Sequence, residues 1–375
     1  MDAGALAATR SVCGWACDMA VWLDSAGTYL AAASWIGRNW AAVAIALTCL
    51  SLLTFLVLWL SKYVRISLRI FTDTTPSPLP TPPMDFQRLH GEEIRFRSFD
   101  GTSLRGMMLP APNRSACKGT IVFCHEYASD MYGCARYARP LVESGFDVFT
   151  FDFRGHGESS NWGKYRPLQW PSDKDMEDVL GACAHVEAAL AAEGKPPDIG
   201  LFGISRGAGA ALLAASTDPN VKAIICDGAF GTETTVISFM KKWAHLFARV
   251  KLVYENHTET FWRLLVWLLI RFAQPRMGCR YLSVRKALKE MQARPIFFIH
   301  GGKDRYIHVE QTQLLYELAP SPKYLWAAEG AKHNQSVVVQ PRQYAARTVA
   351  FFRRHLARED VVEEEITSPS DIEVA

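Results

Sequence analysis

Apolar runs of strand length alternate with amphipathic stretches along most of this chain. The apolar runs occur at residues 120–125, 146–152, 198–204, 221–226, 295–299 and 323–328. Stretches with helical spacing of apolar residues lie between or after them, at 133–144, 175–193, 208–216 and 343–357. Two earlier runs, 92–99 and 103–109, flank the pair Asp100-Gly101, which predicts an antiparallel hairpin. The pattern predicts an α/β fold with a doubly wound, mostly parallel sheet and helices on both of its faces.

A longer apolar stretch precedes this pattern. Trp40 to Leu60 spans 21 residues without a charge, and a helix of that length reaches about 31 Å, enough to cross a bilayer core. Basic residues follow between Lys62 and Arg69, so the positive-inside rule places the rest of the chain on the cytoplasmic side. We expect a single-pass membrane protein. A cleaved signal peptide fits the position and length poorly, and a buried soluble helix is the remaining alternative.

These patterns divide the chain into five predicted parts. They are an N-terminal extension (1–39), a transmembrane helix (40–60), a basic juxtamembrane and Pro-rich linker (61–85), a large folded domain (86–358) and an acidic tail (359–375). From Glu359 onward seven residues are acidic and none is Lys or Arg, which is typical of a disordered, solvated terminus.

The motif that carries most chemical information is Gly203-Ile204-Ser205-Arg206-Gly207. It lies between an apolar run and a small-residue helical run, the strand–turn–helix context of a nucleophile elbow. Such a turn is tight enough to require small flanking residues, here Gly203 and Gly207. It would lift the Ser205 hydroxyl above the sheet edge, next to the free N–H groups of a helix N-terminus. The alternative is that Ser205 only caps the helix.

Two later strands end in loops with the groups that a serine nucleophile needs. The run 295–299 leads into a loop ending at Asp304, and the run 323–328 into a loop ending at His333. An imidazole must accept the serine proton, and a carboxylate must fix the tautomer of that imidazole. We therefore predict a catalytic set of Ser205, Asp304 and His333. Its rivals are Asp227 for the acid, at the end of the preceding strand, and for the base His300 and His308.

Residues 86 to 357 resemble the α/β-hydrolase superfamily, in its serine esterase, lipase and aminopeptidase-like branch. Besides the Ser205 motif, Phe151-Asp-Phe-Arg-Gly-His-Gly-Glu-Ser159 resembles the signature that follows the fourth strand of that family. The resemblance implies the family fold and an oxyanion hole made by the backbone N–H groups of Tyr127 and Arg206. His125-Glu126-Tyr127 stands where the family usually has His-Gly.

The segment between Asp227 and Pro295 is longer than the single helix that a minimal fold needs, which predicts a small helical cap at about 229–292. Its stretch 261–272 is apolar nearly all round, except for Arg263 and Arg271, which share one face. One interpretation is a lid that lines an acyl pocket or enters the membrane interface. The other is a cap helix packed on the core.

The composition of the chain argues against several kinds of site and partner. The nine cysteines include no CxxC pair, which favours a reducing compartment over a disulfide framework. No Cys/His cluster has metal-ligand spacing, and no P-loop or dinucleotide fingerprint occurs, so we expect no metal and no cofactor. The net charge of +3 is spread rather than grouped with aromatic residues, so we expect no nucleic-acid partner.

Three hypotheses about function follow. The first is a membrane-anchored serine hydrolase of small-molecule esters or thioesters with an apolar acyl group, acting beside the lipid bilayer. The second is a serine aminopeptidase or amidase on the same fold, in which Glu126 or Glu158 would hold a free amine. The third is a membrane-tethered binding protein without catalysis.

Overall fold

The structure is a computed structural model that describes residues 27–30, 33–35, 37–73, 89–161, 163–247 and 257–367. The chain divides into two compact units, one ending at Ile66 and the other beginning at Ser67. Most of the predicted N-terminal extension lies outside the described residues. The same holds for residues 74–85 of the predicted linker.

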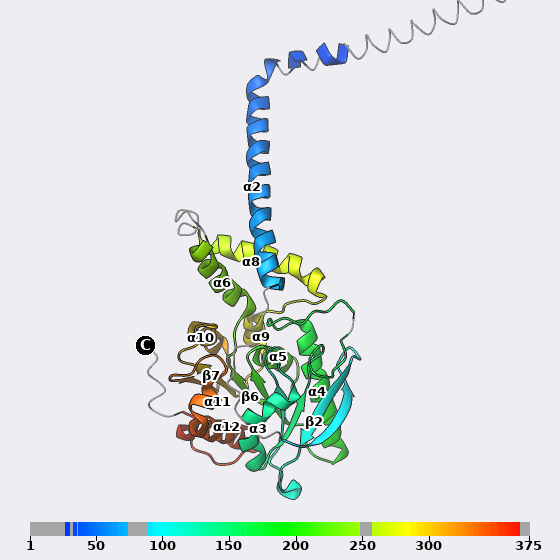
Figure 1. The fold of residues 1–375 in the computed structure, drawn as a ribbon, viewed down its shortest axis with the longest axis vertical. Coiled ribbons are helices and arrows are strands. Elements are labelled where there is room, and N and C mark those ends of the chain that lie inside the picture. The colour runs from blue at the N-terminus through cyan, green and yellow to red at the C-terminus, as the bar shows by residue number, and fades with distance from the viewer. Residues whose placement is uncertain are drawn as a thin grey trace, which may run out of the picture. The chain divides into compact units, whose positions relative to one another are not determined.

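An eight-stranded sheet forms the centre of the second unit (Figure 1). Its strands lie in the order β1-β2-β4-β3-β5-β6-β7-β8. Their bounds are β1 Glu92–Arg97, β2 Ser103–Leu109, β3 Thr120–Cys124, β4 Asp147–Phe151, β5 Ile199–Ile204, β6 Val221–Asp227, β7 Ile296–Gly301 and β8 Lys323–Ala328. The pairs β1–β2 and β2–β4 are antiparallel, and the other neighbours are parallel. The predicted α/β fold with a doubly wound, mostly parallel sheet is confirmed.

The register of the parallel strands aligns their carboxyl ends. Cys124 at the end of β3 is opposite Gly203 of β5, and Asp227 at the end of β6 is opposite Ile204. Gly301 of β7 is opposite Ala328 of β8. The loops that follow these strands therefore meet at one edge of the sheet, which is where open α/β sheets bind their ligands.

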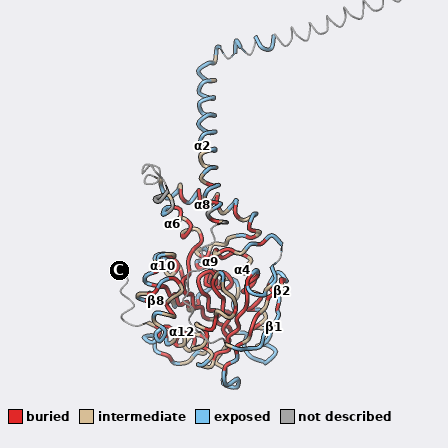
Figure 2. The backbone as a smooth tube through the Cα atoms, viewed as in Figure 1, coloured by how far each residue is buried: buried red, intermediate tan, exposed pale blue. Residues whose placement is uncertain are grey.

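Helices cover both faces of this sheet. Their bounds are α3 Ala135–Glu143, α4 Asp173–Ala192, α5 Arg206–Ala215, α6 Thr232–Phe247, α8 Glu259–Met277, α9 Val284–Glu290, α10 Val309–Leu318, α11 Ser336–Val339 and α12 Pro341–His355. One core cluster joins the sheet to α4, α5, α9 and α10, and a second joins the other face to α3 and α12. The strands are mostly buried (Figure 2).

The segment between β6 and β7 contains α6, α8 and α9. Helix α8 packs on α6 and buries one face, which includes Trp262, Leu265 and Leu269. On its outer face Trp267 is 61% exposed and Leu264 is 48% exposed. This face also carries the exposed Arg263 and Arg271. The helix therefore packs as a cap helix while leaving an apolar strip between two arginines on its surface.

Helix α2 runs from Trp40 to Asp73. Its part from Trp40 to Arg69 is the one helix among the described residues that is long and apolar enough to cross a membrane. The helix extends beyond Leu60, where the predicted transmembrane helix ends. Residues 61–73, which were predicted to be the first part of the linker, are also helical. Charged side chains such as Lys62 do not interrupt backbone hydrogen bonding, and Lys and Arg are good helix formers.

The prediction of a disordered tail from residue 359 is wrong for residues 359–367. Val361 and Ile366 are buried in the core cluster beside α12, and the Ile366 carbonyl accepts a hydrogen bond of 2.8 Å from Arg347. The carboxylate of Glu359 lies 2.9 Å from the Lys118 ammonium. The free energy gained by burying the two apolar side chains exceeds the cost of ordering the charged residues beside them. Residues 368–375 lie outside the described part of the chain.

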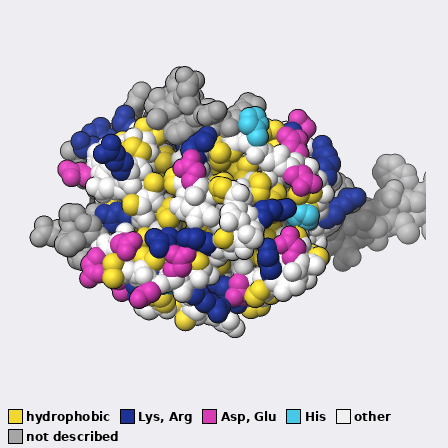
Figure 3. Space-filling view, turned by 90° about the horizontal axis from the view of Figure 1, so that it is seen from below, with side chains coloured by type: hydrophobic (Ala, Val, Ile, Leu, Met, Phe, Trp, Pro, Cys, Tyr) yellow, Lys and Arg dark blue, Asp and Glu magenta, His cyan; other side chains and the backbone are white. Residues whose placement is uncertain are grey.

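Charged side chains of both signs share the surface. On the face shown in Figure 3, Lys and Arg side chains lie beside Asp and Glu side chains and between apolar ones. On this face the basic residues are spread, as the sequence pattern predicts. The described cysteines are all free, and five of the seven are buried.

Candidate active site

The turn between β5 and α5 holds Ser205 in a strained backbone conformation, with φ 52° and ψ −112°. A Cβ atom on Gly203 would lie 2.5 Å from backbone atoms of the following helix, and one on Gly207 would lie 2.2 Å from the Cys124 carbonyl oxygen. Both glycines are therefore required by close backbone approach. Only small residues allow the turn to bring Ser205 to the edge of the sheet, beside the end of β3.

Ser205, His333 and Asp304 form a continuous chain of hydrogen bonds. The Ser205 Oγ lies 2.8 Å from His333 Nε2, and His333 Nδ1 lies 2.6 Å from Asp304 Oδ2. Because a carboxylate only accepts, Nδ1 carries the proton, and Nε2 is left to accept from the serine hydroxyl. The structure thus brings together three residues that are separated by up to 128 positions in the chain.

Asp304 is held as a carboxylate by its surroundings. Its Oδ1 accepts backbone hydrogen bonds of 2.8 Å from Tyr306 and 2.9 Å from Ile307. Burial alone would raise the pKa of this carboxyl, but the hydrogen bond and charge of His333 hold the pKa below its ordinary value. One oxygen is therefore fixed by the loop backbone, and the other is directed at His333.

The rival residues have other partners. The Asp227 Oδ2 accepts a hydrogen bond of 2.9 Å from the Tyr344 hydroxyl, and burial raises the pKa of Asp227 to about 7. His300 Nε2 donates to the Ile307 carbonyl at 3.0 Å, and burial lowers the pKa of His300 to about 4. His308 is exposed at the start of α10. None of the three occupies the place of Asp304 or His333.

The two residues that the resemblance assigns to an oxyanion hole lie next to each other. The Arg206 guanidinium lies 5.9 Å from the centre of the Tyr127 ring. Neither backbone N–H has a backbone acceptor in the described part of the chain, and the N–H of Arg206 belongs to the first turn of α5, where intrahelical acceptors are absent. Among the described residues, both N–H groups therefore lack a backbone acceptor, as the prediction of an oxyanion hole requires.

Glu126, which replaces the usual glycine of the family, points inward. Its side chain is buried, and burial raises the pKa of the carboxyl. Its Oε1 lies 3.8 Å from the Arg136 guanidinium, whereas Oε2 has no hydrogen-bond partner among the described residues. Glu158, the other acidic residue considered for binding an amine, is largely exposed and paired with Arg105 at 2.8 Å.

The partner of the Arg206 side chain was not predicted from the sequence. Arg206 and Asp175 are fully buried and form an ion pair. The guanidinium also donates to Tyr165 at 3.2 Å and to His156 Nε2 at 3.1 Å. Burial lowers the pKa of His156 to about 3, so this imidazole is neutral and accepts. The residue after Ser205 is therefore anchored to the start of α4.

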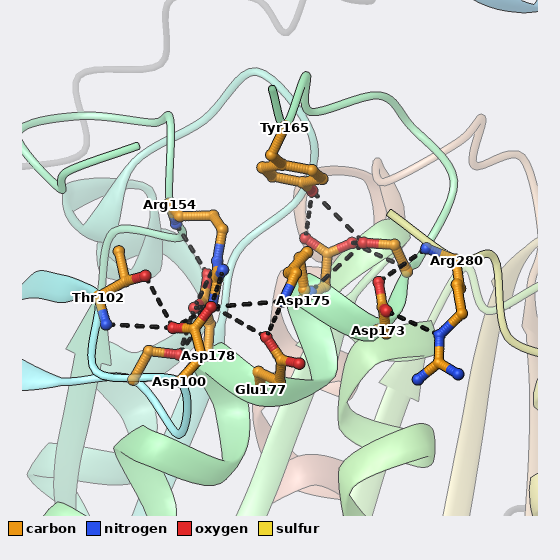
Figure 4. A network of polar contacts seen from close by, with 12 residues as sticks. Asp100, Thr102, Arg154, Tyr165, Asp173, Asp175, Glu177, Asp178 and Arg280 are labelled. Carbon is orange, nitrogen blue, oxygen red and sulfur yellow. Dashed lines mark hydrogen bonds and ion pairs between the residues drawn. The ribbon is translucent and has the colours of Figure 1, made fainter. Parts of the chain in front are cut away.

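The first turns of α4 carry further carboxylates, each bound to a distant residue (Figure 4). Asp173 accepts from Arg280, which follows the cap helix α8, at 3.1 Å. Asp178 accepts from Arg154, in the loop after β4, at 2.6 Å. Asp175 shares its turn with both. The start of α4 thus connects the nucleophile turn, the cap segment and the loop after β4.

A cavity of about 550 Å³ opens beside this site. It is lined by Lys303, Asp304, Arg305, Tyr306, Lys332 and His333. The Tyr306 ring packs edge-on against the His333 ring, with 5.4 Å between the ring centres. No group of three or more potential ligands among the described residues is arranged to hold a metal ion.

Comparison with known families supports the architecture. The model of the serine aminopeptidase family S33 matches residues 115–263, which contain the Ser205 turn and the buried strands beside it. The chain has the α/β-hydrolase fold. Asp304 and His333 lie beyond the matched segment. Their position at the carboxyl ends of β7 and β8 is known from the structure of this α/β-hydrolase itself.

Two bacterial relatives match the α/β-hydrolase domain. The uncharacterized protein YqkD of Bacillus subtilis is 26% identical over 272 residues, which cover 68% of this chain and 81% of YqkD. The uncharacterized protein YfhR of Escherichia coli K12 is 25% identical over 246 residues, which cover 64% of this chain and 73% of YfhR. Both alignments cover most of the relative's own length.

Two solved structures show the same fold. An esterase of Pyrococcus furiosus has a TM-score of 0.53 and 22% identity, and the match covers 75% of this α/β-hydrolase and 96% of the esterase. The acylaminoacyl peptidase of Pyrococcus horikoshii has a TM-score of 0.54 and 20% identity, covering 75% and 44% respectively. At this identity the likeness concerns the fold.

Proposed function

We propose that the protein is a membrane-anchored serine hydrolase that cleaves a carboxylic ester or thioester with an apolar acyl group. The observation that carries the proposal is the hydrogen-bonded chain from Ser205 through His333 to Asp304, with links of 2.8 and 2.6 Å. A serine in that setting is an activated nucleophile, because the imidazole can take its proton as the bond to carbon forms.

The mechanism follows from this geometry. Ser205 attacks the carbonyl carbon while His333 Nε2 accepts the hydroxyl proton, and Asp304 stabilises the imidazolium. In this proposal the N–H groups of Tyr127 and Arg206 stabilise the negative charge on the carbonyl oxygen. His333 then gives its proton to the leaving oxygen or sulfur. Water hydrolyses the acyl-enzyme by the same steps.

An aromatic wall supports an apolar acyl group. From the His333 ring, packed side chains continue through Tyr306 to Phe239 of α6, with 5.5 Å between these two ring centres. Phe239 in turn lies 6.0 Å from Trp170, and Trp170 lies 5.9 Å from Phe230. Aromatic side chains provide large apolar contact area. Trp170 and Phe230 are buried, whereas Tyr306 and Phe239 are half-buried. An acyl chain bound near His333 would therefore meet the apolar surface of the latter two rings.

Membrane attachment is the second part of the proposal. The apolar part of α2 is long enough to cross a bilayer, and the basic residues between Lys62 and Arg69 favour a cytoplasmic position for the hydrolase domain. On α8, the exposed Trp267 between two arginines is typical of a helix that contacts a membrane surface. An enzyme held there would meet amphiphilic substrates at high local concentration.

An aminopeptidase or amidase activity is the alternative. It is favoured by the match to the S33 serine aminopeptidase family and by the unpartnered Oε2 of the buried Glu126. A carboxylate in that position would attract the free ammonium group of a peptide N-terminus. An aminopeptidase or amidase would use the same Ser205 nucleophile. The two activities would therefore differ only in their substrates.

The test compares substrates on the full chain in detergent. We expect p-nitrophenyl acyl esters to be hydrolysed, aminoacyl-arylamides to be hydrolysed far more slowly, and the Ser205→Ala variant to lose both activities. Preferential hydrolysis of the arylamides would establish the alternative instead. A folded wild-type protein that turns over neither class would be explained by the third hypothesis, a binding protein.

A further inference from the structure

The cavity beside His333 has an unusual charge. Three of its six lining residues are the cations Lys303, Arg305 and Lys332. Two of them flank Asp304 in the chain and the third precedes His333. The cationic residues are thus direct neighbours of the residues proposed to act in catalysis.

The loops that carry these cations are tied together. The Lys303 N–H donates to the Ala331 carbonyl at 2.7 Å, and the Asp304 N–H donates to the Gly301 carbonyl at 2.9 Å. A Cβ atom on Gly301 would lie 2.4 Å from the Lys332 carbonyl oxygen, so the two loops pack backbone to backbone. The backbone segments that carry the three cations are therefore packed together around one opening.

The positive charge of the cavity is not neutralised by its own lining. Lys303, Arg305 and Lys332 are exposed, and none forms an ion pair within the described part of the chain. The only carboxylate in the lining is Asp304, whose oxygens already accept from His333 and from two backbone N–H groups. An anion that enters the cavity could therefore bind the three cations without displacing a carboxylate of the protein.

The position of the cavity identifies which part of a substrate it would hold. Its lining includes His333 and Asp304 but not Ser205. The histidine gives its proton to the departing oxygen or sulfur, so groups around His333 contact the leaving part of the substrate.

We infer that the preferred substrate has an anionic leaving group, an alcohol or thiol that bears phosphate or carboxylate, joined to an apolar acyl chain. This inference rests on the proposed function and names its substrate class. In the reaction, the Ser205 oxygen forms a bond to the carbonyl carbon, and the bond from that carbon to the leaving oxygen or sulfur breaks. The proton taken from Ser205 passes through His333 to the leaving atom, and water later releases the acid.

Matched substrate pairs test the inference on the full chain in detergent. One pair compares a 1-acylglycerol 3-phosphate with the neutral monoacylglycerol, and a second compares an acyl-coenzyme A with the neutral N-acetylcysteamine thioester. The readout is the ratio of kcat/KM for the anionic and the neutral member of a pair. The first pair represents a lipid headgroup as the source of the anion, and the second a soluble thiol.

We expect the wild type to prefer the anionic member of at least one pair. The variant Lys303→Gln/Arg305→Gln/Lys332→Gln should lower that ratio about tenfold to a hundredfold, as the loss of three partly exposed charge contacts implies. The preference of the wild type should also weaken with added salt. The matched control removes three exposed cations elsewhere, in the variant Arg95→Gln/Arg114→Gln/Lys289→Gln, and should retain the wild-type ratio.

The outcomes separate this inference from the proposed function. Hydrolysis of both members of each pair, with a ratio that the cavity variant leaves unchanged, overturns the inference and leaves the serine hydrolase intact. An equal loss in the control variant also overturns it, because the effect would then be one of overall charge. Absence of hydrolysis of all four substrates by folded wild type overturns both. A fall in the ratio for one pair only identifies the source of the anion.

Discussion

Replacing Asp304 by Asn should nearly abolish turnover for a reason that can be read from its hydrogen bonds. In the wild type, Oδ1 accepts from the Tyr306 and Ile307 N–H groups, and Oδ2 accepts from His333 Nδ1 at 2.6 Å. An asparagine must keep its carbonyl oxygen at the two backbone donors. Its NH₂ group then faces Nδ1, which can only accept from it.

The imidazole would consequently carry its proton on Nε2, facing Ser205. In that tautomer it cannot take the serine proton, and the same change in a serine-protease triad lowers kcat about 10⁴-fold, or about 5 kcal/mol of activation free energy. We expect a loss of this size in kcat for p-nitrophenyl ester hydrolysis, with little change in Tm because the side chain keeps its shape.

The control is Asp227→Asn. This side chain bonds Tyr344 rather than His333, so we expect its kcat to stay within about tenfold of the wild type. If Asp304→Asn kept more than a tenth of the wild-type kcat while Asp227→Asn lost several orders of magnitude, the assignment of the acid would be wrong.

Three further predictions concern residues that surround Ser205, Asp304 and His333. Asp175→Asn removes the anionic partner of the buried Arg206 and should cost about 3 kcal/mol, which lowers the Tm by roughly 6–12 °C; an unchanged Tm would contradict the anchoring role. Burial raises the pKa of Asp227 to about 7, so the native state binds this proton more tightly than the unfolded chain, and stability falls as pH rises from about 4 to 7. The Tm of Asp227→Asn minus the Tm of the wild type should therefore increase from pH 5 to pH 8. A difference in Tm that does not change with pH would refute this. Gly207→Ala should lower both Tm and kcat, because its Cβ would lie 2.2 Å from the Cys124 carbonyl oxygen.

The strands and the placement of Ser205, Asp304 and His333 could be predicted because their signals are local. Each strand is a short apolar run, and each of the three residues lies in the turn or loop that follows one. Parallel strands then bring their carboxyl ends to one edge without any further information.

Contacts between distant segments could not be predicted in this way. The acidic stretch from Asp173 to Asp178 looks like an ordinary charged helix start, but its partners Arg154, Arg206 and Arg280 lie 24 to 107 residues away. The only local signal was the pair Ser172 and Asp175, which forms a capping box. In the acidic C-terminal stretch, charge obscured the burial of Val361 and Ile366.

The proposed activity depends above all on Ser205 being an activated nucleophile. The most direct measurement is to treat the full chain with a fluorophosphonate probe and to locate the adduct by peptide mass spectrometry, beside Ser205→Ala and His333→Ala variants. We expect one adduct, on Ser205, that is absent in the first variant and strongly reduced in the second. A folded wild-type protein without an adduct, or an adduct on Ser205 that forms equally fast without His333, would contradict it.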